Sequence, residues 1–320
     1  MKTTLYIVIP CYNEEKVLPV TAGQFKEKLL SLIAAGKISD KSRIMFVNDG
    51  SKDKTWELIS QYHAEDKHYS GVNLSRNRGQ QNALLAGLNT AAQFADAIIT
   101  MDVDLQDDIN AIDEMIEKYE DGCEVVYGVR KARKKDSFFK RSTALGFYKV
   151  INKMGGEVIY NHAEYRLMSK RAVLSLAEYK ETNLFLRGLV PMVGYKSDIV
   201  FYERAKRVAG ESKYPLRKLI SLAYEGITSL SVKPINIIRS LGLAFSIIGL
   251  AGVIATIVLS CLGIISTSWI TLAAVVAVGG ILQFSLGVIG DYVGKTYMES
   301  KHRPRYFIAD ILNDAESGND

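Results

Sequence analysis

The sequence predicts an α/β protein in which a doubly wound, mostly parallel sheet is followed by a membrane-associated part. Over the first ~130 residues, short β-rich apolar runs alternate with stretches of helical periodicity, a pattern typical of parallel sheets covered by helices. Between residues 241 and 292, by contrast, the chain has one acidic residue, Asp291, and no basic residue. That composition indicates membrane helices.

The expected elements of the first part alternate as strand and helix. The strands are predicted at Leu5–Pro10, Arg43–Asn48, Gly71–Leu74, Ala97–Met101 and Glu124–Tyr127, and the helices at Leu18–Ile33, Thr55–His63, Gln81–Gln93 and Ile109–Tyr119. In such sheets, ligands bind outside the carboxyl ends of the strands. The polar residues that follow the first four strands are therefore expected to face one cleft.

Two uncharged runs, 241–265 and 269–289, are each long enough to span a membrane, since ~20 residues cross the hydrocarbon core of a bilayer. Basic residues flank the pair on its outer sides, among them Arg239 before it and Lys295 after it. By the positive-inside rule, both termini lie in the cytoplasm. We expect a multi-pass protein of the inner (plasma) membrane, and a pair of buried core helices is the alternative.

The predicted domains are a cytoplasmic α/β domain at 1–210, a juxtamembrane amphipathic helix at 211–234, the two membrane helices within 235–292 and a cytoplasmic tail at 293–320. In the juxtamembrane segment, apolar residues recur at helical spacing, while Arg217 and Lys218 fall on another side. This pattern is typical of a helix lying in the membrane interface. A helix packed on the first domain is the alternative.

Charge and cysteine content limit the classes of ligand and structural site that the sequence favours. The formal net charge of +5 includes basic stretches at Arg130 to Arg141 and Arg204 to Lys218, which favour anionic lipids or phosphorylated ligands. With a membrane anchor, we do not expect nucleic acid as a partner. The three cysteines are scattered and lack Cys-x-x-Cys spacing, so neither a disulfide framework nor a zinc site is indicated.

The sequence has no glycine-rich loop of the kind that binds phosphate. The sequence contains neither the Gly-x-Gly of a dinucleotide-binding turn nor the Gly-x4-Gly-Lys of a P-loop. Asp102 and Asp104 follow the fourth strand, where both carboxylates can reach a hard cation that bridges diphosphate oxygens, and Gln106 is a further oxygen ligand candidate. The alternative is a solvated pair, with Asp107 and Asp108 capping the next helix. Asp49 ends the second strand, where it either forms part of a turn or binds a ribose or base.

These motifs, taken together and in order, resemble glycosyltransferase family 2, and more specifically the polyprenyl-phosphate glycosyltransferases. Bactoprenol glucosyltransferases with two C-terminal membrane helices are the nearest likeness, and dolichol-phosphate mannosyltransferases are more distant. The segments that carry the resemblance are Ile9 to Glu15, Asn48 to Thr55, Asp102 to Asp107, Tyr127 to Arg130, Tyr165 to Ser169, Gly210 to Tyr214 and Arg303 to Tyr306.

The resemblance implies a GT-A fold, which is Rossmann-like, and a set of site residues. It assigns the nucleotide to Pro10, Tyr12, Glu14, Asp49 and Asp102, a Mg²⁺ or Mn²⁺ ion to Asp102, Asp104 and Gln106, and the acceptor phosphate to Arg130, Arg204, Arg207, Ser212 and Lys213. Asp104, Glu164 and Arg130 are then the candidate catalytic residues. Two positions depart from the family pattern, because Asn48 and Glu164 stand where aspartates are usual.

The chemistry makes Glu164 a doubtful base. A phosphate monoester has a second pKa near 6, so the nucleophile is already largely deprotonated at neutral pH. Positioning the two phosphates and stabilising the departing diphosphate should dominate catalysis. We therefore predict that Glu164 orients other groups or is linked to the metal.

The predicted function is inverting transfer of a sugar from a nucleotide-sugar donor, UDP-glucose by preference, to undecaprenyl phosphate at the cytoplasmic membrane face, for cell-envelope glycan modification. N-acetylglucosamine, galactose, aminoarabinose and mannose donors stay open. A polysaccharide synthase is one alternative, although its Gln-x-x-Arg-Trp segment is absent from the sequence. A non-catalytic nucleotide-sugar sensor or scaffold is another. Expected partners are membrane lipids, with a second copy of the chain and a product flippase as further candidates.

Overall fold

The computed structural model describes residues 2–131, 162–181, 185–205 and 268–314, with scattered positions between 235 and 263. Its strands are β1 (Leu5–Cys11), β2 (Arg43–Asn48), β3 (Tyr69–Leu74), β4 (Ala97–Thr100), β5 (Val125–Arg130), β6 (His162–Ser169), β7 (Ser197–Tyr202) and β8 (Ile308–Leu312). Its helices are α1 (Leu18–Ala34), α2 (Thr55–Glu65), α3 (Gln80–Ala91), α4 (Ala111–Glu120), α6 (Lys170–Ala177), α7 (Leu186–Met192) and α10 (Ser268–Ser300). The five strands and four helices predicted between residues 5 and 127 are confirmed to within a few residues.

The strands form one sheet in the order β7-β5-β6-β4-β1-β2-β3-β8. The centre, from β3 through β2 and β1 to β4, is parallel, as the alternation of strands and helices predicted. β6 runs antiparallel between β4 and β5, and β8 runs antiparallel along β3. β6, β7 and β8 were not expected from the sequence, and the sheet is therefore more mixed than predicted.

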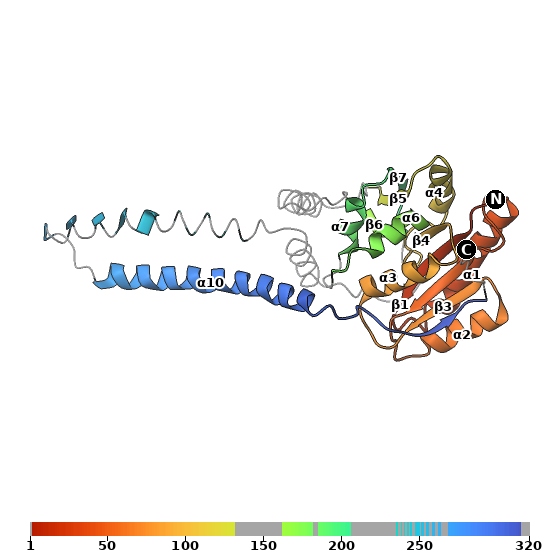
Figure 1. Ribbon diagram of the computed structural model, residues 1–320, viewed down its shortest axis with the longest axis horizontal. Coiled ribbons are helices and arrows are strands. Elements are labelled where there is room, and N and C mark those ends of the chain that lie inside the picture. The colour runs from red at the N-terminus through yellow and green to blue at the C-terminus, as the bar shows by residue number, and fades with distance from the viewer. Residues whose placement is uncertain are drawn as a thin grey trace.

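Helices cover both faces of the sheet, which confirms the doubly wound arrangement (Figure 1). Every residue of β2 and β4 is buried, as expected for strands packed on both faces. On one face the core joins α1 and α4 to the sheet through Phe25 and Met115. On the other face, α3, α6 and α7 pack through Leu84, Val173 and Leu189.

The chain returns to the sheet after α10. The backbone N–H of Ser75 donates to the carbonyl of Phe307 at 3.0 Å, and β8 then pairs with β3 from Gly71 to Leu74. The side chain of Asn89 on α3 donates to the hydroxyl of Tyr306 at 2.9 Å. The segment that was predicted only as a tail therefore contributes the edge strand beside β3.

α10 extends away from the α/β body as one long helix and includes the predicted span 269–289 (Figure 1). The predicted juxtamembrane helix at 211–234 lies outside the described residues, as does most of the predicted span 241–265. Among the positions that the structure describes, no helix combines the length and the apolar character that crossing a membrane requires. Both membrane spans stay predictions.

Candidate active site

The loops after β1 and β2 brace one another at the carboxyl edge of the sheet. The backbone N–H of Asn13 donates to the hydroxyl of Ser51 at 2.9 Å, and that of Glu14 donates to the hydroxyl of Thr55 at 2.8 Å. Asn13 adopts a left-handed backbone conformation, with φ of 54°, which asparagine tolerates better than most residues. Of the predicted nucleotide-binding residues, Pro10 therefore lies near the end of β1, and Tyr12 and Glu14 lie in the braced loop that follows, with Tyr12 exposed.

Asp49, at the end of β2, anchors the loop that leads into α3. Its carboxylate is buried and accepts the backbone N–H groups of Arg78 at 2.7 Å and Gly79 at 2.9 Å. Burial raises the pKa of Asp49, although these two hydrogen bonds act in the opposite direction. Gly50 has to be a glycine here, since a Cβ at that position would lie 2.4 Å from the backbone of residues 76 and 77.

Asn48, which stands where the family usually has aspartate, joins a chain of polar contacts. Its amide donates to the side chain of Asn73 at 2.8 Å, and Asn73 donates in turn to Asp310 of β8 at 2.9 Å. An aspartate at position 48 has no amide hydrogen to donate to Asn73. The exchange is thus accommodated by the strand that the C-terminal segment adds.

The residues after β4 form the acidic centre of the site. Gln80 donates to Asp102 at 2.9 Å, and the backbone N–H of Gln106 donates to Asp104 at 3.1 Å. Between them Leu105 has φ of 51°, an uncommon conformation for a non-glycine residue that sharply turns the chain. This turn brings the side chains that follow β4 back toward the edge of the sheet.

The pKa of Asp102 shows how crowded the negative charge is. It rises to about 7, first because the surrounding protein desolvates this partly buried group and then because Asp107, Asp104 and Glu164 carry like charges nearby, while Arg130 opposes them. A cation at this edge would relieve that repulsion.

The donor set fits a hard divalent metal. Asp102, Asp104 and Gln106 offer only oxygen atoms, which Mg²⁺ and Mn²⁺ prefer. Within the described part of the chain, no group of three or more His, Cys, Asp or Glu side chains is arranged to hold an ion by itself. A metal here would therefore combine these side chains with phosphate oxygens of a ligand, as Mg²⁺ commonly does.

Asp107 does not cap the following helix, which corrects the prediction that Asp107 and Asp108 cap it. The N-cap position of α4 is Asn110, whose side chain makes no capping hydrogen bond, and the carboxylate of Asp108 accepts the backbone N–H of Asn110 at 3.0 Å. Asp107 is buried instead and accepts hydrogen bonds from Arg130 at 3.0 Å and from the hydroxyl of Tyr202 at 2.6 Å. Arg130 is the last residue of β5, which extends three residues beyond the predicted end at Tyr127, and its guanidinium is oriented by this buried carboxylate. Sequence reasoning missed Tyr202.

Glu164 lies in β6, directly beside the end of β4, and is 5% exposed. It forms ion pairs with Arg166 and, at 2.8 Å, with Arg187, and it accepts a hydrogen bond from Gln81 at 3.0 Å. Burial alone would raise its pKa, but Arg166 and Arg187 outweigh burial and hold the pKa at about 2. The group is therefore ionised at neutral pH and paired, as an orienting role requires.

The basic residues predicted for the acceptor phosphate are only partly placed. Arg204, just after β7, donates to the side chain of Gln106, which brings it to the acidic centre. Arg207, Ser212 and Lys213 lie outside the described residues.

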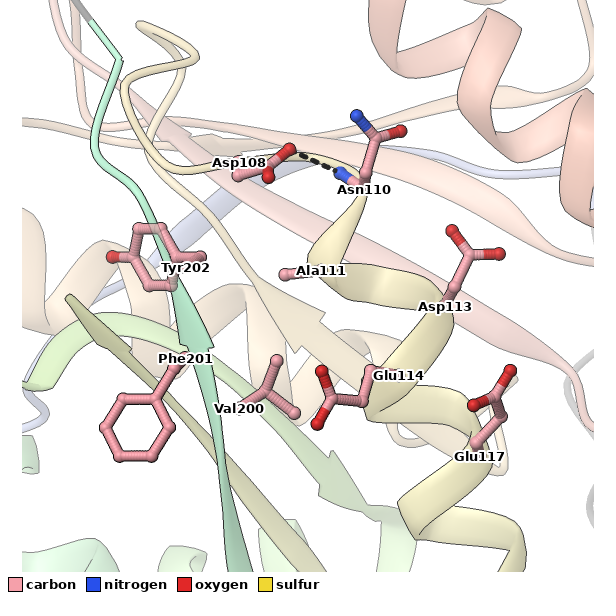
Figure 2. A pocket seen from close by; sticks show the side chains of 9 residues that line it. All are labelled: Asp108, Asn110, Ala111, Asp113, Glu114, Glu117, Val200, Phe201 and Tyr202. Atoms are coloured by element: carbon pink, nitrogen blue, oxygen red, sulfur yellow. Dashed lines mark hydrogen bonds between the residues drawn. The ribbon is translucent and has the colours of Figure 1, made fainter. Parts of the chain in front are cut away.

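A separate hollow lies between α4 and β7 (Figure 2). Its lining is largely acidic, with Asp108, Asp113, Glu114 and Glu117 around it and Phe201 and Tyr202 on the strand side. Lys37 pairs with Asp113 and Glu117 at 3.2 and 2.9 Å. So many carboxylates would repel a diphosphate, which makes this hollow a poor site for an anionic ligand.

Comparison with known proteins places the chain among glycosyltransferases. The profile of glycosyl transferase family 2 matches residues 6–176. The uncharacterized glycosyltransferase YkoT of Bacillus subtilis (strain 168) is 46% identical over 312 residues, which cover 97% of this chain and 93% of the relative. The prophage bactoprenol glucosyl transferase homolog of Escherichia coli (strain K12) and the bactoprenol glucosyl transferase of Shigella phage SfV are each 38% identical, over 94% of this chain and 97% of the relative.

Solved structures give a more distant likeness. Glucosyl-3-phosphoglycerate synthase from Mycobacterium tuberculosis superposes with a TM-score of 0.46 at 17% identity, over 71% of this chain and 79% of the other. A mannosyltransferase from Pyrobaculum calidifontis, solved with GDP-Man and Mn²⁺, has a TM-score of 0.42 at 15% identity, over 94% and 85% of the two chains.

Proposed function

Because this chain belongs to glycosyl transferase family 2, we propose that it transfers glucose from UDP-glucose to undecaprenyl phosphate at the cytoplasmic face of the plasma membrane. Family membership makes the chain a glycosyltransferase. The lipid acceptor and the sugar are inferred from relatives named bactoprenol glucosyl transferase, which match over 94% of this chain. The nucleotide, the metal and the membrane location are part of the proposal.

One structural observation carries the proposal: paired acidic and basic side chains from separate strands meet at the carboxyl edge of the sheet. Asp102 and Asp104 follow β4, while Arg130 ends β5 and is held by Asp107. A diphosphate with a bound cation needs both signs of charge close together. Asp102, Asp104 and Gln106 would hold the ion, which would supply Lewis-acid stabilisation of the leaving diphosphate.

The reaction requires no protein base. An oxygen of the acceptor phosphate forms a bond to the anomeric carbon of the sugar as the bond from that carbon to the nucleoside diphosphate breaks. The electron pair of the broken bond leaves with the nucleoside diphosphate. With a pKa of about 2, Glu164 is a poor proton acceptor at neutral pH, which supports its predicted orienting role. Arg130, held by Asp107, would bind phosphate charge.

The exposed surface of α10 supports a membrane location. Val278, Leu282 and Phe284 are 52%, 58% and 69% exposed in an isolated chain. Large exposed apolar surfaces on a soluble protein are uncommon and mark contact with lipid or with another protein. A lipid phosphate could then reach the carboxyl edge of the sheet while its tail stays in the hydrocarbon.

The test is a transfer assay with the full chain. Purified protein is incubated with undecaprenyl phosphate and a panel of radiolabelled nucleotide-sugars, with and without a chelator, and the lipid fraction is extracted. We expect label from UDP-glucose in the lipid, and loss of that product when metal is removed. Labelled lipid from a different nucleotide-sugar would mean that UDP-glucose is not the donor. If no donor gives labelled lipid, undecaprenyl phosphate is not the acceptor.

A further inference from the structure

Arg187 is the exposed member of an otherwise buried charge cluster. It lies in the first turn of α7, and its Nε donates to Oε1 of Glu164 at 2.8 Å. The side chain of Arg187 is 31% exposed, whereas those of Glu164 and Arg166 are only 5% and 2% exposed. Arg187 is not among the residues predicted from the sequence, since no recognised motif surrounds it.

Glu164 is the carboxylate that joins the two arginines of the cluster. It is paired with both Arg166 and Arg187. Arg166 is committed to the interior, where it also donates to the carbonyl of Leu186 at 3.4 Å. Arg187 is therefore the arginine of this pair that can contact a ligand, because its side chain is partly exposed.

Two neighbouring glutamines tie this cluster to the acidic centre. At the start of α3, Gln80 donates to Asp102, and the next residue, Gln81, donates to Glu164. The side-chain oxygen of Gln81 also accepts the backbone N–H of Leu186 at 3.0 Å, which fixes the start of α7. Arg187 is consequently held beside the reaction centre, on the side opposite the loops predicted to bind the nucleotide, because β6 lies across β4 from β1.

The position of α7 relates this cation to the lipid side of the molecule. Figure 1 shows α7 at the end of the body from which α10 extends. If α10 enters the membrane, a lipid phosphate approaches the body from that end. The planar guanidinium can bind a phosphate through paired hydrogen bonds while a carboxylate fixes its orientation.

We propose that Arg187 binds the phosphate of the polyprenyl-phosphate acceptor and that Glu164 and Gln81 are positioning residues for it. This inference rests on the proposed function. The same chemistry would suit the donor diphosphate, so the test separates the two phosphates.

The test compares Arg187→Gln and Arg187→Lys with a control, Arg171→Gln, in the full-length protein. Arg171 on α6 is also an arginine paired with a glutamate, Glu124, but its side chain is 67% exposed and lies outside the cluster. KM is measured for undecaprenyl phosphate at saturating donor and for the donor at saturating acceptor. Equilibrium binding of a short-chain prenyl phosphate provides a readout that is independent of turnover.

For Arg187→Gln we expect the acceptor KM and the prenyl phosphate Kd to rise about tenfold or more, with the donor KM within about twofold of the unmodified chain. Arg187→Lys keeps the charge but loses the planar guanidinium. Its acceptor KM and prenyl phosphate Kd should therefore lie between those of the unmodified chain and of Arg187→Gln, about threefold or more above the unmodified chain. The control should match the unmodified chain in all three constants. Arg187→Lys decides the matter if the glutamine variant does not fold.

Two results would overturn the inference while leaving the proposed function standing. One is an unchanged acceptor KM and prenyl phosphate Kd in both Arg187 variants. The other is a donor KM that rises as much as the acceptor KM, which would assign Arg187 to the diphosphate. An unmodified chain that forms no labelled lipid refutes the proposed function itself, and the acceptor role of Arg187 with it.

Discussion

Asp102, just after β4, and Glu164, on the neighbouring strand β6, are acidic side chains whose surroundings shift their pKa values in opposite directions. Burial acts on both, yet the pKa of Asp102 rises to about 7 and that of Glu164 falls to about 2. The neighbours differ, since Asp102 has carboxylates around it and Glu164 has two arginines. The comparison indicates one cluster suited to an incoming cation and another whose carboxylate is already paired within the protein.

The largest expected difference between the two clusters is in turnover. Asp104→Asn should lower transfer by at least about 1,000-fold, because it removes a carboxylate from the proposed metal site. Glu164→Gln should leave measurable turnover, since the acceptor needs no base. Both are measured in the membrane transfer assay at a temperature where each variant is folded. An equal loss of turnover in the two variants would contradict the different roles assigned to Asp104 and Glu164.

The second largest expected difference between the two clusters is in how much a bound ligand stabilises the protein. UDP with Mn²⁺ should raise the unfolding temperature of the unmodified chain and of Glu164→Gln, because a ligand held at about 100 times its Kd adds about 2.7 kcal/mol. Asp104→Asn should show little of this gain. The control is UDP with a chelator. If Asp104→Asn responds to UDP and Mn²⁺ as fully as the unmodified chain, the metal site lies elsewhere.

The ion pairs of Glu164 should contribute to the free energy of unfolding even without a ligand. Glu164→Gln leaves Arg166 buried without its counter-charge, and breaking one partner of a buried pair costs about 3 kcal/mol. Denaturant unfolding of the detergent-solubilised chain measures this loss. Glu124→Gln, which removes the partner of exposed Arg171, is the matched control and should cost no more than about 1 kcal/mol. A similar loss of unfolding free energy in the two variants would mean that burial does not increase the cost of breaking the Glu164 ion pairs.

The smallest effect is a change in that stability difference with pH. Folding lowers the pKa of Glu164 from 4.5 to about 2, so its ionised form stabilises the fold fully above pH about 4.5. The stabilisation is lost as the pH falls from there toward 2. The stability gap between the unmodified chain and Glu164→Gln should therefore be constant from pH 8 to 5 and narrow below pH about 4.5. Narrowing already at pH 6 would contradict the low pKa.

Much of the framework could be predicted from residue patterns. Apolar runs located β1 to β5, and the rule that ligands gather at strand ends selected Asp49, Asp102 and Arg130. β6 was not predicted, although apolar and polar side chains alternate from Ala163 to Leu167, a pattern that favours a strand. The pairing of β8 escaped prediction because β8 lies far from its partner β3 in sequence. Gln80 and Gln81 could have been suspected from their place just after a strand-to-helix turn.

The order of residues determined which local elements form and which chemical groups stand at the strand ends, because periodicity and side-chain type are local properties. It also indicated, from the acidity of a phosphate acceptor, that Glu164 need not be a base. Only the tertiary structure decided how those groups are paired. Tyr202 meets Asp107 across 95 positions of chain, and Gln81 meets Glu164 across 83. Burial and neighbouring charge, which set the opposite pKa values of Asp102 and Glu164, arise from such distant contacts.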